Sequence, residues 1–290
     1  MTATLTQPQI EALLGAPGAC NAIKVARLLA NAGHPTVIVG GAVRDLFLGK
    51  TPKDIDLATA AQPLEVAGLL RAFPEHGFTF EEVGGSLSHG VAVIRHLDSS
   101  DFIEVATFRT ETPAGDGRHA VVEYTQDLRA DLARRDFTIN ALALDPTNFT
   151  VIDPFGGLLD IKNRKIRAVG NPTVRFAEDN LRALRLLRFV DKLGFSVDPE
   201  TLTAATNVLR NAGLTTFSAV STERIAQEVL QTSTFQGFSR GAPLALTRHI
   251  ITKSERLHSR GVRTEHFRNC ARIVCTHNRK RGLEVHEVLA

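Results

Sequence analysis

The chain has 290 residues, 43% of them hydrophobic, which is typical of a globular protein with one large domain or two smaller ones. No apolar run reaches membrane-spanning length and the first residues lack the basic start of a signal peptide, so we expect neither membrane insertion nor export. Three cysteines are too few for a disulfide framework, which fits a reducing cytoplasm.

The net charge of +3 is unevenly distributed along the chain. Residues 240–290 hold 11 Lys and Arg against 4 Asp and Glu, whereas residues 1–239 hold 23 against 27. A basic tail of this kind can bind nucleic acid through its phosphates, although a run of charge is more often simply solvated.

Hydrophobic periodicity and turn residues predict alternating helices and strands up to residue 108, which indicates a mixed sheet with helices. The predicted helices cover residues 19–32, 42–48 and 63–70, and the predicted strands cover residues 37–39, 54–58, 79–83, 91–95 and 102–108. Residues 109–118 are polar and rich in turn formers, and we expect no regular structure there.

Two glycines, Gly40 and Gly41, follow the predicted strand at residues 37–39 and precede a helix. Glycines here let the backbone turn tightly and approach a ligand, and the unpaired N–H groups of a helix start attract phosphate. Arg44 falls in the first turn of that helix, where a guanidinium can grip a phosphate. The alternative is an ordinary turn.

Asp54 and Asp56 stand two residues apart on the next predicted strand, so both leave the same face while Ile55 packs into the core. Two carboxylates this close repel unless a cation lies between them, and Mg²⁺ prefers such oxygen ligands. A solvated strand face is the alternative. The phosphate-binding turn and the acid pair occur close together and in the right order, which favours metal-assisted nucleotidyl transfer.

Downstream, the pattern becomes helical. The three-residue spacing of Leu181, Leu184 and Leu187 puts them on one stripe and predicts a helix over residues 178–193, which Gly194 should end. Further helices are predicted to start at Pro199 and near residues 221–224.

Three runs resemble motifs of the class II tRNA nucleotidyltransferases (CCA-adding enzymes) and the related bacterial poly(A) polymerases. They are GGAVRDLFLGKTPKDIDLAT from Gly40, ARRDFTINAL from Ala133 and EDNLRALRLLRF from Glu178. The resemblance covers roughly residues 20–235. It implies an α+β fold with a polymerase-beta-like nucleotidyltransferase head (residues 1–168), an all-helical neck (169–232) and a basic tail (233–290).

The resemblance also implies which residues act. The catalytic carboxylates are expected to be Asp54, Asp56 and Glu104, with the first two holding Mg²⁺. Glu104 is a lone acid on a predicted strand, and solvent exposure without a role is nearly as well supported. The expected nucleotide-binding residues are Gly41, Arg44, Arg135, Asp136, Asp179, Arg182, Arg185 and Arg188. Arg135 is expected on the phosphate or ribose and Asp136 on a ribose hydroxyl, although a surface ion pair is the alternative, while Asn140 orders the local backbone.

Asp179 and Arg182 would present an acceptor and donors side by side to the edge of a base. Cytosine and adenine both carry an amine next to a ring-nitrogen acceptor, which this pair complements, whereas uracil and guanine place a carbonyl there. The alternative is a plain intrahelical ion pair, worth about 0.2–0.5 kcal/mol.

The implied activity is transfer of C, A or both from CTP and ATP to the 3′ end of tRNA, with release of pyrophosphate. A poly(A) polymerase would share nearly all these residues, and an inactive RNA-binding remnant is a third hypothesis. Family members usually run longer, and residues 233–290 lack clear periodicity, so we expect a truncated or diverged end. His266, Cys270, Cys275 and His277 match no structural zinc pattern.

Overall fold

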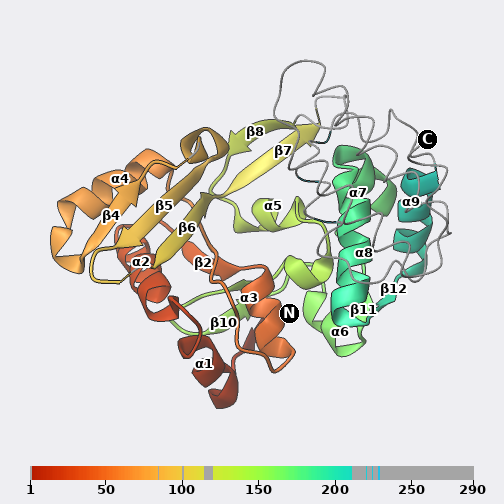
Figure 1. The fold of residues 1–290 in the computed structure, drawn as a ribbon, viewed down its shortest axis with the longest axis horizontal. Coiled ribbons are helices and arrows are strands. Elements are labelled where there is room, and N and C mark those ends of the chain that lie inside the picture. The colour runs from red at the N-terminus through yellow and green to blue at the C-terminus, as the bar shows by residue number, and fades with distance from the viewer. Residues whose placement is uncertain are drawn as a thin grey trace, which may run out of the picture. The chain divides into compact units, whose positions relative to one another are not determined.

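The computed structural model describes residues 2–83, 85–99, 101–113 and 120–210, together with residues 220, 224 and 228 (Figure 1). The chain divides into two compact units. The first comprises residues 1–112 and 122–163, and the second comprises residues 113–121 and 164–290. The predicted tail, the helix start at residues 221–223 and the four His and Cys residues considered for zinc lie outside the described residues.

An eight-stranded mixed sheet forms the first unit, in the order β1-β10-β9-β2-β3-β6-β5-β4. The strands are β1 (Thr2–Thr4), β2 (Thr36–Val39), β3 (Leu57–Thr59), β4 (Phe78–Glu81), β5 (Val91–His96), β6 (Phe102–Thr107), β9 (Ala143–Leu144) and β10 (Thr150–Ile152). Strands β3 and β6 pair in parallel, with Leu57 opposite Val105, and the other neighbouring pairs of this sheet are antiparallel. The two central strands β3 and β6 therefore run in the same direction.

Helices pack along this sheet. They are α1 (Gln7–Leu14), α2 (Ala19–Asn31), α3 (Gly41–Phe47), α4 (Pro63–Ala72), α5 (Leu128–Ala133) and α6 (Gly157–Lys162), with short 3₁₀ turns η1 (Pro74–His76), η2 (Ser86–His89) and η3 (Thr138–Asn140). Helix α2 packs on β2 and β3, and α4 packs on β4, β5 and β6 (Figure 1). Helix α4 starts where the sequence predicts, because Pro63 occupies its first turn and Glu65 accepts a hydrogen bond from the Gln62 N–H at 2.7 Å.

Two expectations for the first unit are wrong. The strand predicted over residues 54–58 begins only at Leu57, because the ladder to β6 starts at the Leu57–Val105 pair and leaves Asp54 and Asp56 in the approach to the strand. The segment expected to be irregular contains β7 (Arg109–Pro113), which pairs with β8 (Ala120–Tyr124). Residues 114–119 between these strands lie outside the described residues.

Helices dominate the described part of the second unit: α7 (Pro172–Glu178), α8 (Leu181–Leu193) and α9 (Pro199–Arg210). Short strands β11 (Lys165–Ile166) and β12 (Ser196–Val197) pair in parallel, which the sequence did not predict. Helix α8 ends as predicted at Gly194, whose φ of 63° is left-handed, and α9 begins at Pro199 as predicted. Within the described residues no helix is long and apolar enough to cross a bilayer.

The helix predicted over residues 178–193 is broken at its start. Helix α7 ends at Glu178, and Asp179 has extended backbone angles (φ −148°, ψ 103°) before α8 begins at Leu181. The carboxylate of Asp179 accepts a hydrogen bond from the Leu181 N–H at 3.0 Å, so this side chain serves a new helix start instead of continuing the old helix.

Gly157 marks the tightest packing in the first unit and gives a direct test of it. A Cβ at this position would lie 2.2 Å from the carbonyl oxygen of Thr138, a backbone atom that cannot easily move. We expect Gly157→Ala to lower the free energy of unfolding by about 1–3 kcal/mol or to prevent folding.

The matched control is Gly68→Ala in the exposed face of α4, where nothing lies within 4 Å of the added methyl group. This change should raise the free energy of unfolding by roughly 0.5–1 kcal/mol. Urea unfolding followed by circular dichroism measures both, and equal stability of Gly157→Ala and the wild type would refute the packing argument.

Candidate functional site

The acid pair lies directly before β3. Asp54 and Asp56 are exposed and Ile55 between them is buried, and the Asp56 carbonyl accepts a hydrogen bond from the Val39 N–H at 3.0 Å. Val39 is the last residue of β2, so the sheet ladder fixes the backbone that carries the two carboxylates. Each of the two residues as a whole remains accessible.

Glu104 joins this pair through the register of the sheet. Leu57 of β3 lies opposite Val105 of β6 in a parallel pair, and Asp56 and Glu104 each precede these residues by one position. Glu104 is exposed whereas its neighbours on both sides are buried, so it leaves the strand away from the core. The structure thus brings the three predicted carboxylates to one edge of the sheet.

The pKa of Asp56 is raised above its ordinary value. Loss of water around the carboxylate contributes most, although the residue as a whole stays accessible, and the negative charges of Glu104 and then Asp54 add to it. The guanidinium of Arg135 acts in the opposite direction. The surroundings of Asp56 therefore disfavour its charged form.

Two carboxylates that repel each other are a donor set that fits a hard divalent cation. Among the described residues no group of three or more His, Cys, Asp or Glu side chains is arranged to hold a metal ion. A cation at Asp54 and Asp56 would consequently take its other ligands from water or from the oxygens of a substrate.

The Gly40 turn lies beside this acidic edge. Gly40 follows β2 and has a positive φ of 71°, and Gly41 opens α3. A Cβ on Gly40 would stand 3.1 Å from Nη1 of Arg135, so the absence of a side chain admits the guanidinium. Arg135 also interacts electrostatically with Asp56, so its positive charge acts on the acid pair as well as lying beside the turn.

One hydrogen-bond donor of Arg135 lacks a partner among the described residues. Its Nη2 donates to Asp131 at 3.2 Å, while its Nε is buried and has no hydrogen-bond partner in the structure. Burial lowers the pKa of this guanidinium, with the carboxylate of Asp131 opposing that shift. A buried donor without an acceptor is uncommon in folded proteins and calls for an explanation.

Arg44 and Asp136 support the turn from within the fold. Arg44 is buried, pairs with Asp45 at 2.8 Å and donates to Oδ1 of Asn140 at 2.6 Å. The Nδ2 of Asn140 in turn donates to Asp136 at 3.0 Å, and the same Asp136 oxygen accepts the Phe137 N–H. In this structure Arg44, predicted to bind phosphate from the first turn, lies instead in the last turn of the short helix α3 and is engaged with Asp45 and Asn140.

In the second unit, Arg182 points toward α7. Its Nη1 donates to Glu178 at 2.7 Å and to the carbonyl of Arg175 at 2.8 Å, and the side chain is 10% exposed. Glu178 also receives Arg175 at 2.7 Å. This network holds the guanidinium against the break between the two helices.

Among the described residues, the carboxylate of Asp179 does not share the partners of Arg182. One of its oxygens caps α8, and the other accepts from Nη2 of Arg224 at 3.0 Å. Arg185 and Arg188, one turn apart on α8, both pair with the buried Glu228. The acid pair belongs to the first unit and these helix residues belong to the second.

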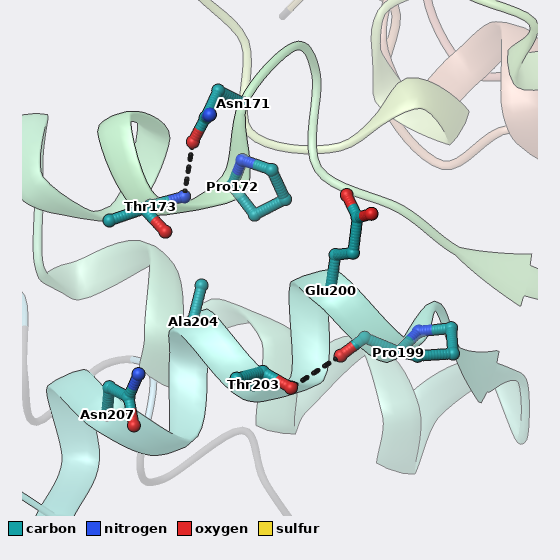
Figure 2. Close-up of a pocket in the computed structure, with 8 residues that line it drawn as sticks. All are labelled: Asn171, Pro172, Thr173, Pro199, Glu200, Thr203, Ala204 and Asn207. Atoms are coloured by element: carbon teal, nitrogen blue, oxygen red, sulfur yellow. Dashed lines mark hydrogen bonds between the residues drawn. The ribbon is translucent and has the colours of Figure 1, made fainter.

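A pocket of about 370 Å³ opens between the first turns of α7 and α9 (Figure 2). Its lining residues are Asn171, Pro172, Thr173, Pro199, Glu200, Thr203, Ala204 and Asn207. Asn171 accepts from the Thr173 N–H, and Thr203 donates to the Pro199 carbonyl, so these polar groups serve the helices themselves. None of the predicted site residues lines this pocket.

Comparison with known proteins identifies the head. Residues 36–167 match the family model described as "Poly A polymerase head domain". These residues are therefore similar to a poly(A) polymerase head domain. The predicted polymerase-beta-like nucleotidyltransferase head, with its mixed sheet and helices, is thereby confirmed, as is the resemblance to the CCA-adding enzymes.

Curated relatives extend the match beyond the head domain. The CCA-adding enzyme of Levilactobacillus brevis is 41% identical over 224 residues, 77% of this chain and 52% of that protein. The CCA-adding enzyme of Geobacillus sp. (strain WCH70) is 43% identical over 208 residues, 71% of this chain and 47% of that protein. The chain thus spans about half the length of the curated relatives it matches.

Solved structures give the same family. The Bacillus stearothermophilus CCA-adding enzyme in complex with CTP aligns with a TM-score of 0.60 and 36% identity, covering 80% of this chain and 52% of that one. The Thermotoga maritima CCA-adding enzyme complexed with tRNA_CCA aligns with a TM-score of 0.61 and 25% identity, covering 87% and 54%.

The charge imbalance at the head-domain site is testable without any substrate. Because desolvation and like charges disfavour the ionised Asp56, Asp56→Asn should raise the stability of the metal-free protein at neutral pH, by less than about 1 kcal/mol since the residue is accessible. Thermal unfolding in chelator measures this effect.

Added Mg²⁺ should stabilise the wild type more than the Asp56→Asn variant, because the variant lacks one anionic ligand. Asp98→Asn, a change in an exposed acid after β5, is the control and should alter neither value. A destabilised Asp56→Asn protein would contradict the stated electrostatics.

Proposed function

We propose that this chain is a template-independent nucleotidyltransferase that adds C, A or both to the 3′ end of tRNA from CTP and ATP and releases pyrophosphate. One observation carries the proposal: within a poly(A) polymerase head domain, Asp54, Asp56 and Glu104 gather at the sheet edge beside the Gly40 turn and Arg135. A tRNA substrate also implies a cytoplasmic location.

Divalent metal ions are general to nucleotidyltransferases of this kind, and we propose Mg²⁺ here, held by Asp54 and Asp56. The bound ion would supply positive charge at the α-phosphate and favour ionisation of the attacking hydroxyl. Glu104 adds negative charge beside this pair, which favours retention of the cation.

In the proposed reaction the 3′-hydroxyl oxygen forms a bond to the α-phosphorus and the bond from that phosphorus to pyrophosphate breaks. The hydroxyl proton passes to a carboxylate of the acidic edge or to water. The head domain's contribution is positioning and charge. Gly40 and Gly41 let the triphosphate approach the backbone, and the guanidinium of Arg135 beside Gly40 offers it positive charge.

Arg44 and Asp136 contribute through the Gly40 turn in this proposal. Their link through Asn140 braces the start of α3, so the turn keeps its shape when phosphate approaches. Asp136 would meet the ribose hydroxyl only with an oxygen that its contacts to Asn140 and Phe137 leave accessible, and Arg44 would reach phosphate only by leaving Asn140.

Base choice is assigned to the neck. Asp179 would accept from the exocyclic amine of cytosine or adenine, and Arg182 would donate to the adjacent ring nitrogen. The contacts of Arg182 with Glu178 and Arg175 hold its guanidinium in place, which reduces the entropy lost on binding. Arg185 and Arg188 would face the triphosphate while sharing Glu228.

A bacterial poly(A) polymerase is the second candidate, because the matching family model bears the poly(A) polymerase description. Both candidates use the same head-domain chemistry and differ in nucleotide choice and acceptor. Purified protein with Mg²⁺ and radiolabelled CTP or ATP, on tRNA lacking its terminal CCA, separates them: CTP incorporation supports tRNA repair, and long ATP-only tails support poly(A) synthesis.

Removal of one proposed metal ligand tests the reaction itself. We expect Asp54→Ala to reduce transfer to background while unfolding at nearly the wild-type temperature, because the side chain is exposed and lies outside the core. Lys53→Ala, an exposed neighbour, is the control and should keep its activity. A fully active Asp54→Ala protein would exclude the proposed metal site.

The neck assignment has its own test. Asp179→Asn should lower kcat/KM for CTP and ATP by about tenfold or more, because one good base contact is worth roughly 1–3 kcal/mol. It should also reduce the ratio of kcat/KM for CTP and ATP to kcat/KM for UTP and GTP. Glu200→Gln, an exposed acid on α9, serves as the control. Unchanged selectivity in Asp179→Asn would remove this residue from base recognition.

A further inference from the structure

Asp131 is the centre of an ionic cluster in the head domain for which neither the sequence nor the comparisons assign a role. It lies on α5, and its side chain is 1% exposed. It pairs with Arg134 at 2.8 Å and with Arg135 at 3.2 Å, three and four residues further along the chain. A buried carboxylate that holds two guanidiniums is a fixed anchor point.

The two oxygens of Asp131 have different partners. Oδ1 accepts hydrogen bonds from the Arg134 side chain and, at 3.3 Å, from the backbone N–H of Arg109. Oδ2 accepts a hydrogen bond from Nη2 of Arg135. Arg134 is also paired with Glu111 at 3.0 Å. Arg134 would therefore keep an anionic partner without Asp131, but Arg135 depends on Asp131 for its hydrogen-bonded carboxylate.

The opposite side of Arg135 faces the proposed nucleotide site. Its Nη1 approaches the position of a Gly40 Cβ, its Nε is buried without an acceptor, and its charge acts on Asp56. A guanidinium in this position has two possible anionic partners, which are Asp131 and the acid pair Asp54 and Asp56. Which of the two it contacts decides whether it is available to phosphate.

We propose that Asp131 is a positioning residue for nucleotide binding: its Oδ2 holds the Arg135 guanidinium against the Gly40 turn, so that the guanidinium faces a phosphate of the incoming nucleotide. This inference rests on the proposed function. Without the Asp131 carboxylate, Arg135 turns toward Asp56 and competes there with the metal ion. Asp131 thereby serves both phosphate binding and metal binding through one arginine.

The experiment compares Asp131→Asn with Glu111→Gln in the full-length chain. Glu111 pairs with Arg109 and Arg134 of the same cluster but has no contact with Arg135, so it is the matched control. We measure the Kd of CTP by calorimetry with Mg²⁺, the Mg²⁺ concentration at half-maximal binding, and the unfolding temperature of each variant.

We expect CTP to bind about tenfold more weakly to Asp131→Asn, the size of effect expected when a charge-assisted hydrogen bond is lost, and to require more Mg²⁺. Glu111→Gln should change Kd by less than about twofold, as for a partly exposed ion pair. In an Arg135→Lys background Asp131→Asn should add little further loss, because the two residues act as a unit.

Three results would overturn the inference: an unchanged Kd in Asp131→Asn, an equal loss in Glu111→Gln, or additive losses in the double variant. If Asp131→Asn does not fold, Asp131→Glu keeps the charge one methylene further out, and we expect about threefold weaker binding, with wild-type affinity counting against the inference. If the wild type binds and transfers CTP and Asp131→Asn does so equally well, this inference alone is refuted. If the wild type binds no nucleotide, the proposed function is refuted as well.

Discussion

Negative charge crowded at one edge of a sheet is the constraint around which the head domain is arranged. Asp54, Asp56 and Glu104 are brought together by the parallel pairing of β3 with β6, and loss of water followed by the charge of Glu104 raises the pKa of Asp56. Left alone, such a cluster destabilises the fold. The fold tolerates it because the residues remain accessible to water and ions, and because Arg135 stands close by. A site that is unfavourable when empty binds a cation more readily than one already neutralised.

The positive side of the site depends on interior contacts more than on exposed arginines. Arg44 is tied to Asn140 and Asp136 beneath the turn, and Arg135 is tied to Asp131. Each arginine is thus held by buried partners inside the fold. Such holding reduces the conformational entropy lost when a phosphate binds, which is how a small set of residues can position a highly charged molecule.

The sequence predicted the parts of this arrangement that are local. Glycine signals located the turn after β2 and the end of α8 at Gly194, and Pro199 marked the start of α9. The sequence did not predict element boundaries that depend on contacts between distant segments. Strand β3 starts late because its pairing with β6 begins at Leu57, and α7 and α8 separate where the Asp179 carboxylate accepts the Leu181 N–H. The role of Asp131 was hidden for the same reason. An acid four residues before an arginine is common on helix surfaces, and the sequence alone does not show that this one is buried.

The hydrogen bond between Arg44 and Asn140 joins residues 96 positions apart. During synthesis, a ribosome that has made only the first half of the head domain has produced the glycine turn and the acid pair but not the amide that braces them. The emerging chain must hold a guanidinium without its interior acceptor until residue 140 leaves the exit tunnel. The bracing of the Gly40 turn is therefore possible only after residue 140 has been synthesised, and a shorter nascent chain carries the turn and the acid pair without it.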